Sequence, residues 1–355
     1  MPAARLHGQL FDEPAHRHPY AGSEMPTVLV QGRIAAPKAD LMRRYAPEGW
    51  KVRVWNPDTD EVAVFAPLAQ EADVIVGGAI PVPWPATPKL RLFQIPWAGY
   101  DFTSPERMPA GVPVANTFEH ETAIAEYVLA GMLEWVIGLR RLDEEFRSSG
   151  WGGHATGRAP SHGELRGRTL GIVGYGHIGR ETAHRAKAFG MRCVGVRRSA
   201  APRPPELDWL GQNDRLDELL AEADFVLIAC DMNEETIGLI NAERLALMKP
   251  TGVLINVARG RIVDEDALWS ALSERRIGGA VLDVWYAYPQ PGGEDVWPSK
   301  RPFQDLDNVI LSGHRSASTE EMHQRRWRFV AENCARIGRG EAPRNVVFLG
   351  SGQGG

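Results

Sequence analysis

The sequence predicts an α/β protein built from two doubly wound parallel-sheet domains, and three observations lead to this class. Short apolar runs alternate with helical stretches from Thr27 to Asn116, and again from Leu170 to about Val309. A glycine-rich turn joins one apolar run to a helix. The chain has 355 residues, which is more than one average domain. Strands that alternate with helices form a parallel sheet covered on both faces, so two such sheets are expected.

The first domain is predicted from five apolar runs, at residues 28–30, 52–55, 74–76, 92–95 and 112–114. Two of its loops directly follow a strand and contain glycine. Gly77 and Gly78 form one loop, and Gly99 and Tyr100 belong to the other. Bare backbone N–H groups at the carboxyl end of a strand are able to hold a carboxylate, which makes these four residues candidate substrate contacts. A glycine turn without a ligand is the alternative for either loop.

A long helical pattern runs from about His120 to Phe146. It is followed by an irregular stretch from Trp151 to Ser161, and the second domain comes after that stretch. Further strands are expected near residues 170, 193, 225, 253, 280 and 309, followed by a helix at about 319–337 and a last strand at 344–348. This order suggests that the chain returns to its first domain. We therefore expect a flexible extension at 1–24, a substrate domain at 25–117 with 319–348, a nucleotide-binding domain at 118–318 and a disordered tail at 349–355.

The glycine-rich turn has the spacing Gly-x-Gly-x-x-Gly, at Gly174, Gly176 and Gly179, and lies between a predicted strand and a predicted helix. The first glycine permits the tight turn, the second lets a pyrophosphate approach the backbone, and the third lets the helix pack against the strand. The helix N-terminus offers unpaired N–H groups to phosphates. The turn, with His177 and Ile178, therefore predicts dinucleotide binding. A glycine-rich turn that binds nothing is the alternative.

The residue after the next strand, Arg192 to Val196, selects the dinucleotide. An acid there would accept from the ribose 2′-hydroxyl of NAD, but the position holds Arg197, followed by Arg198 and Ser199. Guanidinium groups bind phosphate oxygens in a bidentate fork. The sequence therefore favours NADP, with NAD as the second choice and a solvated arginine pair as the alternative.

Composition excludes several other classes. The net charge of −5 and the isoelectric point of 6.1 give no support to a nucleic-acid partner. No apolar run has the length of a membrane span. The three cysteines, Cys193, Cys230 and Cys334, have neither metal-site nor disulfide spacing. We expect a cytoplasmic oxidoreductase without a metal.

Several motifs together resemble the D-isomer-specific 2-hydroxyacid dehydrogenases, glyoxylate and hydroxypyruvate reductases among them. Beside the glycine motif they are the segments 248–264, 281–285 and 308–314, with the sequences MKPTGVLINVARGRIVD, VLDVW and NVILSGH. The resemblance covers about 27–345. It implies a Rossmann domain inserted into a smaller flavodoxin-like domain, a homodimer formed around the helix from His120, and hydride transfer between NAD(P)H and C2 of a 2-keto or 2-hydroxy acid.

The resemblance also assigns roles to residues. Arg259 would bind the substrate carboxylate and keto oxygen, since a guanidinium stays charged and grips through two bonds. His314 would give and retrieve the proton. Asp283 would meet the nicotinamide carboxamide, with Val257 and Ala258 lining the same pocket. The third catalytic position, normally a glutamate that pairs with the histidine, is Tyr288 in this sequence.

A phenol brings no charge at neutral pH, so Tyr288 leaves three hypotheses. Tyr288 orients a His314 of lower pKa; another acid, such as Glu119 or Glu121, takes the place of the glutamate; or the reaction needs no strong proton donor, as in the related formate dehydrogenases, which also lack this glutamate. A rival class is a regulatory protein that binds NADP(H) without turnover. Retention of Arg259, His314 and Asp283 favours the enzyme.

Overall fold

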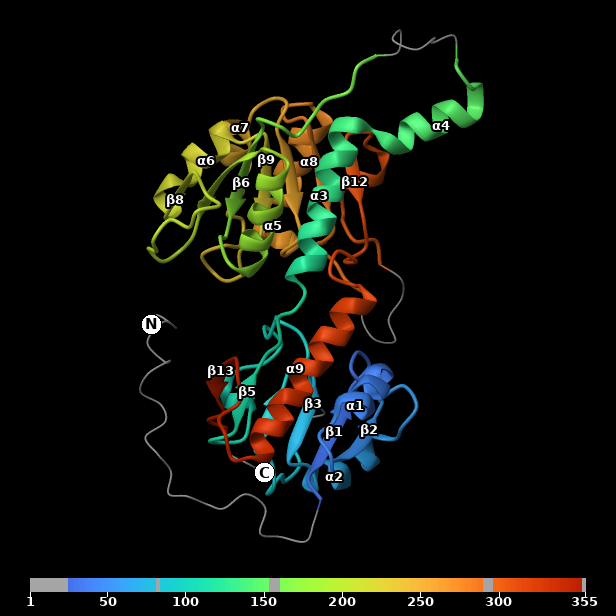
Figure 1. Ribbon diagram of the computed structural model, residues 1–355, viewed down its shortest axis with the longest axis vertical. Helices are drawn as coiled ribbons and strands as arrows, with labels where there is room; N and C mark the ends of the chain where they lie inside the picture. The colour runs from blue at the N-terminus through green and yellow to red at the C-terminus, as the bar shows by residue number, and fades with distance from the viewer. Residues whose placement is uncertain (1–24, 81–83, 153–159, 290–295, 353–355) are drawn as a thin grey trace. The chain divides into compact units, whose positions relative to one another are not determined.

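The computed structural model describes residues 25–80, 84–152, 160–289 and 296–352. The chain divides into two compact units (Figure 1). Unit 1 contains the residues up to Glu119 together with those from Glu320 onward, and unit 2 is His120–Thr319. The N-terminal extension predicted at 1–24 lies outside the described residues.

Unit 1 is a six-stranded sheet in the order β13-β5-β4-β3-β1-β2. Its five N-terminal strands are parallel, and β13 runs antiparallel to β5. The order 2-1-3-4-5 of the parallel strands is that of flavodoxin-like folds, which confirms the predicted class. The strands are β1 (Thr27–Gln31), β2 (Lys51–Trp55), β3 (Val74–Gly77), β4 (Leu92–Gln94), β5 (Pro113–Ala115) and β13 (Val346–Leu349).

Helices α1 (Ala39–Tyr45) and α9 (Glu320–Gly338) share one core of unit 1, in which Trp327, Val330 and Cys334 of α9 pack with Val28 and Val30 of β1. Figure 1 shows α9 alongside this sheet. A second core contains helix α2 (Val62–Gln70). Two 3-10 helices, Ala36–Lys38 and Pro105–Arg107, complete the unit. The C-terminal part of the chain therefore builds the core of the N-terminal unit.

The residues at 349–352 correct one prediction, since they are not a disordered tail. Leu349 pairs with Pro113 as the last residue of β13. The N–H of Gly350 donates to the carbonyl of Val112 at 2.9 Å, and that of Gly352 donates to Met108 at 2.9 Å. Their polar and glycine-rich composition suggested disorder, but backbone hydrogen bonds, which depend little on side chains, fix them.

Unit 2 is a seven-stranded parallel sheet in the order β12-β11-β10-β9-β6-β7-β8. With β6 counted as the first strand, the order is 3-2-1-4-5-6-7, and its first six strands have the order of the Rossmann fold. The strands are β6 (Thr169–Val173), β7 (Arg192–Val196), β8 (Trp209–Gly211), β9 (Phe225–Ile228), β10 (Val253–Asn256), β11 (Gly279–Leu282) and β12 (Val309–Leu311). The edge strand β8 was not predicted, because its three residues are only half-buried and have no apolar run around them.

The helices of unit 2 are α3 (Glu121–Ile137), α4 (Leu139–Ser149), α5 (His177–Ala188), α6 (Leu216–Glu222), α7 (Ala242–Leu247) and α8 (Glu265–Ser273), with 3-10 helices at Asn213–Arg215, Gly260–Ile262 and Phe303–Asp305. The single helix predicted from His120 to Phe146 is in fact two. Gly138 adopts a left-handed φ of 67°, which ends α3, and α4 starts in a new direction. The prediction missed this break because the apolar spacing continues across it.

Among the described residues, no single helix is long and apolar enough to cross a membrane. Helices α3 and α4, which are bent by 50° relative to each other, satisfy that test of length and composition only as a pair. Much of α3 is buried in the core of unit 2 beside β6 and α5.

Candidate active site

The glycine-rich turn connects β6 to α5, and its three glycines have different surroundings. Gly174 has a left-handed φ of 95°, and a Cβ there would lie 2.4 Å from the backbone N of Cys230. A Cβ on Gly179 would lie 2.8 Å from Cγ2 of Ile172. A Cβ on Gly176 would meet no atom within 4 Å. Gly174 and Gly179 are therefore needed by the fold itself, whereas Gly176 leaves open space at the N-terminus of α5, and its role toward a pyrophosphate stays a prediction.

This difference makes a matched pair of substitutions informative. Gly174→Ala is expected to lower the free energy of unfolding by about 3 kcal/mol, because it combines a backbone overlap with a left-handed φ. Gly176→Ala should change the unfolding free energy by less than about 1 kcal/mol but weaken NADPH binding more than about tenfold. Urea denaturation and NADPH fluorescence titration measure the two effects. Wild-type NADPH affinity in Gly176→Ala would show that no pyrophosphate approaches this turn.

Arg197, Arg198 and Ser199 follow β7, as the sequence predicts. The backbone N–H of Arg197 donates to the carbonyl of Gly211 at 3.1 Å, and the carbonyl of Arg198 accepts from Nε2 of Gln212 at 3.1 Å. These bonds to the edge of the sheet fix the backbone and leave the side chains partly or fully exposed. Within the described part of the chain, neither guanidinium forms an ion pair with an acid. Two cations at this strand end suit a phosphate group.

Arg259, Tyr288 and His314 follow three neighbouring strands, β10, β11 and β12 respectively, and the backbone ties these strand ends together. The N–H of Asp283 donates to the carbonyl of Asn256 at 3.1 Å, and the N–H of His314 donates to the carbonyl of Asp283 at 2.7 Å. The carboxyl ends of parallel strands lie at one edge of a sheet, which is where such sheets bind ligands. The structure thus brings the three predicted catalytic residues to the same edge of unit 2.

The loop of Arg259 is shaped by two residues of the same motif. The buried side chain of Asn256 accepts from the N–H of Ala258 at 3.1 Å and donates to the carbonyl of Arg259 at 3.0 Å. A Cβ on Gly260 would lie 2.3 Å from the carbonyl oxygen of Trp285. The motif therefore needs its asparagine to turn the backbone and its glycine to let this loop pack against the segment before Tyr288.

Asp283 is fully buried, and both its carboxylate oxygens are used within the chain. Oδ1 accepts from the hydroxyl of Ser312 and from the N–H of Arg315 at 2.7 Å, and Oδ2 accepts from the N–H of Ser316 at 2.9 Å. The predicted contact between Asp283 and the nicotinamide stays a prediction. What the structure shows is a carboxylate that organises the loop of His314.

The rings of Tyr288 and His314 are neighbours, with centroids 5.7 Å apart and an interplanar angle of 60°. The Tyr288 hydroxyl accepts from the N–H of Trp285 at 3.2 Å, and burial raises its pKa, so the phenol is neutral near pH 7. Burial lowers the pKa of His314, and the positive charge of Arg259 lowers it further, whereas the negative charge of Asp283 opposes both. Tyr288 therefore supplies a polar neighbour without the charge that a glutamate would bring.

The two acids suggested as substitutes for the missing glutamate belong to different units, and their role toward His314 stays a prediction. The carboxylate of Glu121 is 3.7 Å from Nδ1 of His177, at the glycine turn. Glu119 belongs to unit 1, where it lies 3.7 Å from Arg325. Within unit 2, the negative charge of Asp283 favours the protonated form of His314.

Sequence reasoning missed Asn256, Ser312 and Tyr127 as site residues. Ser312 follows β12 directly, and its carbonyl accepts from Nε1 of Trp285 at 2.7 Å. The hydroxyl of Tyr127, on α3, lies 2.7 Å from that of Ser312. A polar residue at the end of an apolar strand is a signal for Asn256 and Ser312. Tyr127 gave none, because it continues the apolar spacing of its helix.

The four predicted substrate contacts Gly77, Gly78, Gly99 and Tyr100 all belong to unit 1. A Cβ on Gly77 would lie 2.3 Å from the carbonyl oxygen of Gln31, and one on Gly78 would lie 2.8 Å from the ring of Trp97. Gln31 also donates from Nε2 to the carbonyl of Gly78 at 3.0 Å. Close packing thus requires the first two glycines, and their role toward a substrate stays a prediction.

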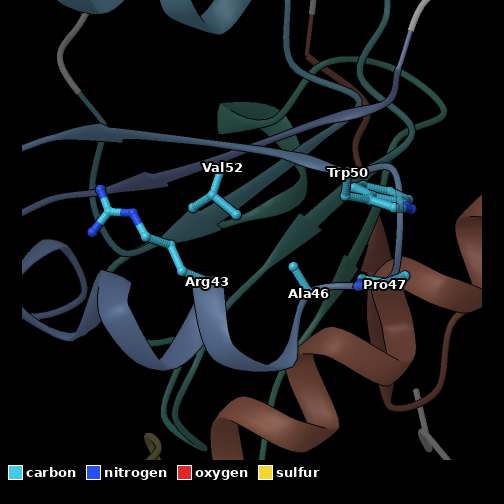
Figure 2. Close-up of a pocket in the computed structure, with 5 residues that line it drawn as sticks. All are labelled: Arg43, Ala46, Pro47, Trp50 and Val52. Carbon is cyan, nitrogen blue, oxygen red and sulfur yellow. The ribbon is translucent and has the colours of Figure 1, made fainter.

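A pocket of about 350 Å³ opens in unit 1 between α1 and β2 (Figure 2). Its one charged lining residue, Arg43, pairs with Asp40 at 2.6 Å. The lining consists of Arg43, Ala46, Pro47, Trp50 and Val52, none of which is a predicted site residue. Over the described ranges, no group of three or more His, Cys, Asp or Glu side chains is arranged to hold a metal ion.

A Rossmann sheet with its glycine turn, and an arginine and a histidine at the ends of the two strands that flank β11, define an NAD(P)-dependent oxidoreductase. Residues 129–316, more than half of the chain, match the family described as D-isomer specific 2-hydroxyacid dehydrogenase, NAD binding domain. A glyoxylate reductase of Thermococcus onnurineus is 34% identical over 339 residues, which are 91% of this chain and 96% of the relative. The chain belongs to the D-isomer-specific 2-hydroxyacid dehydrogenase family.

Solved structures agree with this assignment. A family member from Aeromonas salmonicida has a TM-score of 0.74 at 25% identity, with 92% of this chain and 99% of that chain covered. An NADPH-dependent glyoxylate/hydroxypyruvate reductase from Sinorhizobium meliloti, in complex with NADP and malonate, has a TM-score of 0.71 at 25% identity, with 91% and 97% covered. The predicted family, fold class and NAD(P)-dependent 2-hydroxyacid dehydrogenase activity are thus confirmed.

Proposed function

We propose that this chain is an NADP-preferring reductase of small 2-keto acids such as glyoxylate and hydroxypyruvate. The observation that carries the proposal is the placement of Arg259, Tyr288 and His314 on neighbouring strand ends of unit 2. Relatives named glyoxylate reductase, and the NADP complex of the reductase from Sinorhizobium meliloti, support the choice of substrate and coenzyme.

The proposed roles follow from the chemistry of each side chain. Arg259 binds the substrate carboxylate and polarises the keto oxygen. When bound, the reduced nicotinamide supplies a hydride to C2. Protonated His314 gives its proton to the keto oxygen, so that a hydroxyl forms and the imidazole becomes neutral. Tyr288 orients the ring of His314, and the coenzyme phosphates are held by the glycine turn and by Arg197, Arg198 and Ser199.

The direct test is oxidation of NADPH and NADH with a panel of 2-keto acids, including glyoxylate, hydroxypyruvate, pyruvate and phenylpyruvate. The assay covers about pH 5.5 to 8.5, the range in which an imidazole titrates. Turnover that prefers NADPH and a small keto acid is the expected result. Absence of turnover with every acid of the panel would refute the proposal.

The second candidate is a regulatory protein that binds NADP(H) without turnover. Tyr288 at the position of the acid, together with the lowered pKa of His314, favours it, because both reduce the supply of protons near pH 7. Tight NADPH binding with no reaction in either direction would identify it. Turnover confined to NADP⁺ reduction would instead indicate oxidation of a hydride donor such as formate.

Coenzyme preference gives a specific prediction. The double variant Arg197→Asp with Arg198→Ser should raise KM for NADPH about a hundredfold and change KM for NADH much less, because only NADPH carries the 2′-phosphate. Steady-state kinetics with both coenzymes measures the ratio. Arg215→Ser serves as the control, since that half-buried arginine pairs with Glu218 and lies over the ring of Trp209. Equal losses for both coenzymes would contradict the assignment.

A second copy of the chain is the partner that we propose for α4. Its apolar residues Leu139, Leu142 and Phe146 share one face and are exposed by 64%, 37% and 57%. Phe146 also stacks edge-on against the exposed Trp151 at 5.9 Å. No residue of α4 is buried, and Figure 1 shows the helix extending away from the sheet of unit 2. An exposed apolar stripe of this kind marks an interface.

Phe146→Glu is therefore expected to convert a homodimer to a monomer, because a charge within the stripe costs several kcal/mol in a buried interface. Size-exclusion chromatography with light scattering at about 10 μM measures the mass; a Kd in the nanomolar range keeps the wild type dimeric there. Arg140→Ala, on the same helix, is the control and should stay dimeric. A monomeric wild type would refute the interface.

We also place the enzyme in the cytoplasm, where its three free thiols stay reduced.

A further inference from the structure

The loop that carries His314 is connected to helix α3 by a chain of side chains. The hydroxyl of Tyr127 lies 2.7 Å from Oγ of Ser312. The hydroxyl of Ser312 donates to Oδ1 of Asp283. The backbone carbonyl of Asp283 accepts from the N–H of His314 at 2.7 Å. Three side chains thus link the first half of α3 to the backbone of the candidate acid/base.

The proton positions in this chain follow from the donors that are present. A carboxylate only accepts, and Asp283 also receives the N–H groups of Arg315 and Ser316. Ser312 has a single hydroxyl proton, which it gives to Asp283, so its oxygen must accept from Tyr127. Burial raises the pKa of Tyr127, so the phenol keeps the proton that it donates. The bonds therefore run in one direction, from Tyr127 through Ser312 to Asp283, and each one stabilises the buried negative charge.

The backbone of His314 needs this support. Its φ of 56° is in the left-handed region, which costs a non-glycine residue about 1 kcal/mol or more. Such a conformation persists only when its surroundings hold it. Here the carboxylate of Asp283 holds the backbone of His314 on both sides. It accepts from Ser312, which precedes His314 in the chain, and from Arg315 and Ser316, which follow it. A weaker hold on Asp283 would let the loop relax and move the imidazole.

The charges around His314 make its position matter chemically. From the loop after β10, Arg259 brings a positive charge, and Arg315 is the next residue in the chain. From the segment after β11, Asp283 brings a negative charge and Tyr288 a neutral phenol. Asp283 is thus the anion that favours the protonated imidazole. Any movement of the imidazole away from Asp283 makes His314 a poorer proton donor at neutral pH.

We propose that Tyr127 is a positioning residue for His314, and that it acts through Ser312 to hold Asp283 and so to fix the backbone that carries the imidazole. The proposal rests on the role of His314 as the acid/base of the proposed reductase. It assigns a function to a residue of helix α3 whose hydroxyl contacts Ser312. It also names the acid that offsets the loss of charge at position 288.

The test compares Tyr127→Phe with the wild type by NMR titration of the imidazole of His314, whose signal is identified by its loss in His314→Gln. Tyr127→Phe is expected to lower the pKa of His314 by about half a unit, because the imidazole moves away from its anion. For keto acid reduction, kcat should fall about tenfold with little change in KM for NADPH, and the decline of rate with rising pH should begin at lower pH.

Three variants separate positioning from general loss of packing. Tyr45→Phe removes a tyrosine hydroxyl that bonds Gln324 in unit 1, and it should leave the titration and kcat unchanged. Ser312→Ala breaks the same chain of hydrogen bonds and should lower the pKa of His314 and kcat as Tyr127→Phe does. Ser312→Thr keeps the hydroxyl and should restore the wild-type pKa and kcat. If Tyr127→Phe does not fold, the Ser312 pair carries the same test.

An unchanged pKa of His314 in Tyr127→Phe or Ser312→Ala would overturn the inference, as would an equal shift in Tyr45→Phe. The titration needs no turnover. If the wild type reduces no 2-keto acid, the proposed function fails by itself, while the shift of the imidazole pKa still decides whether Tyr127 positions His314.

Discussion

Replacing Arg259 with lysine is expected to lower kcat/KM for glyoxylate about a hundredfold or more, and replacement with alanine about a thousandfold. A lysine retains the charge but loses the planar pair of N–H groups that binds a carboxylate, so the keto oxygen is no longer polarised in a fixed geometry. Loss of one such electrostatic contact typically costs about 10²- to 10³-fold in rate. Steady-state kinetics across glyoxylate concentrations measures the loss.

A matched control lies in the same loop. Arg261, two residues further along the chain, is exposed, and its backbone carbonyl accepts from the N–H of Gly238 at 2.9 Å. Arg261→Lys should therefore keep kcat/KM within about twofold of the wild type, as surface substitutions usually do. Similar kinetics for Arg259→Lys and Arg261→Lys would remove Arg259 from the substrate site.

His314→Gln is expected to reduce kcat for keto acid reduction by about 10²- to 10⁴-fold, the usual contribution of a positioned general acid. Glutamine is able to donate a hydrogen bond but transfers no proton, so NADPH binding should stay within about twofold. The exposed His162, whose ring contacts the carbonyl of Gly163 at 3.0 Å, gives the control His162→Gln. Full activity in His314→Gln would mean that another group supplies the proton.

The pH dependence follows from the sign of the His314 shift. Burial and Arg259 lower the pKa of this imidazole from its ordinary value of 6.5, so reduction should slow as pH rises through a midpoint below 6.5. Oxidation of the 2-hydroxy acid uses the neutral imidazole, so its rate should increase as pH rises through the same range. Tyr288→Glu should move both midpoints to higher pH, since a carboxylate beside His314 favours the protonated form. A midpoint that does not move would show that position 288 does not act on His314.

The central strands were predictable because both faces of a parallel sheet are buried. Val28, Leu29 and Val30 are all 0% exposed, and such continuous apolar runs stand out in a sequence. The edge strand β8 was missed for the opposite reason, since all three of its residues are only half-buried. The break at Gly138 was missed because a single glycine costs a helix only about 1 kcal/mol, and the apolar spacing on either side continues without a gap.

The catalytic side chains were predictable from their motifs, but the hydrogen bonds that place them were not. Arg259 and His314 stand in segments whose order and spacing resemble one family, and Tyr288 was located by counting from Arg259. Nothing in the local sequence around Tyr127 shows that its hydroxyl would meet Ser312, which lies 185 positions away. Contacts between distant segments depend on sheet order, and side-chain pattern alone does not encode them.

The return of the chain to β5 has a consequence for how the protein is made. The core of unit 1 requires Trp327 and Val330 of α9, and its last strand, β13, ends at Leu349. Unit 2, by contrast, is one continuous segment. During synthesis on the ribosome, unit 2 has all its strands while α9 and β13 are still untranslated, so it is the first unit able to fold to completion. The N-terminal strands must wait until α9 and β13 have been translated, and until then β5 is an open sheet edge that invites pairing with other chains.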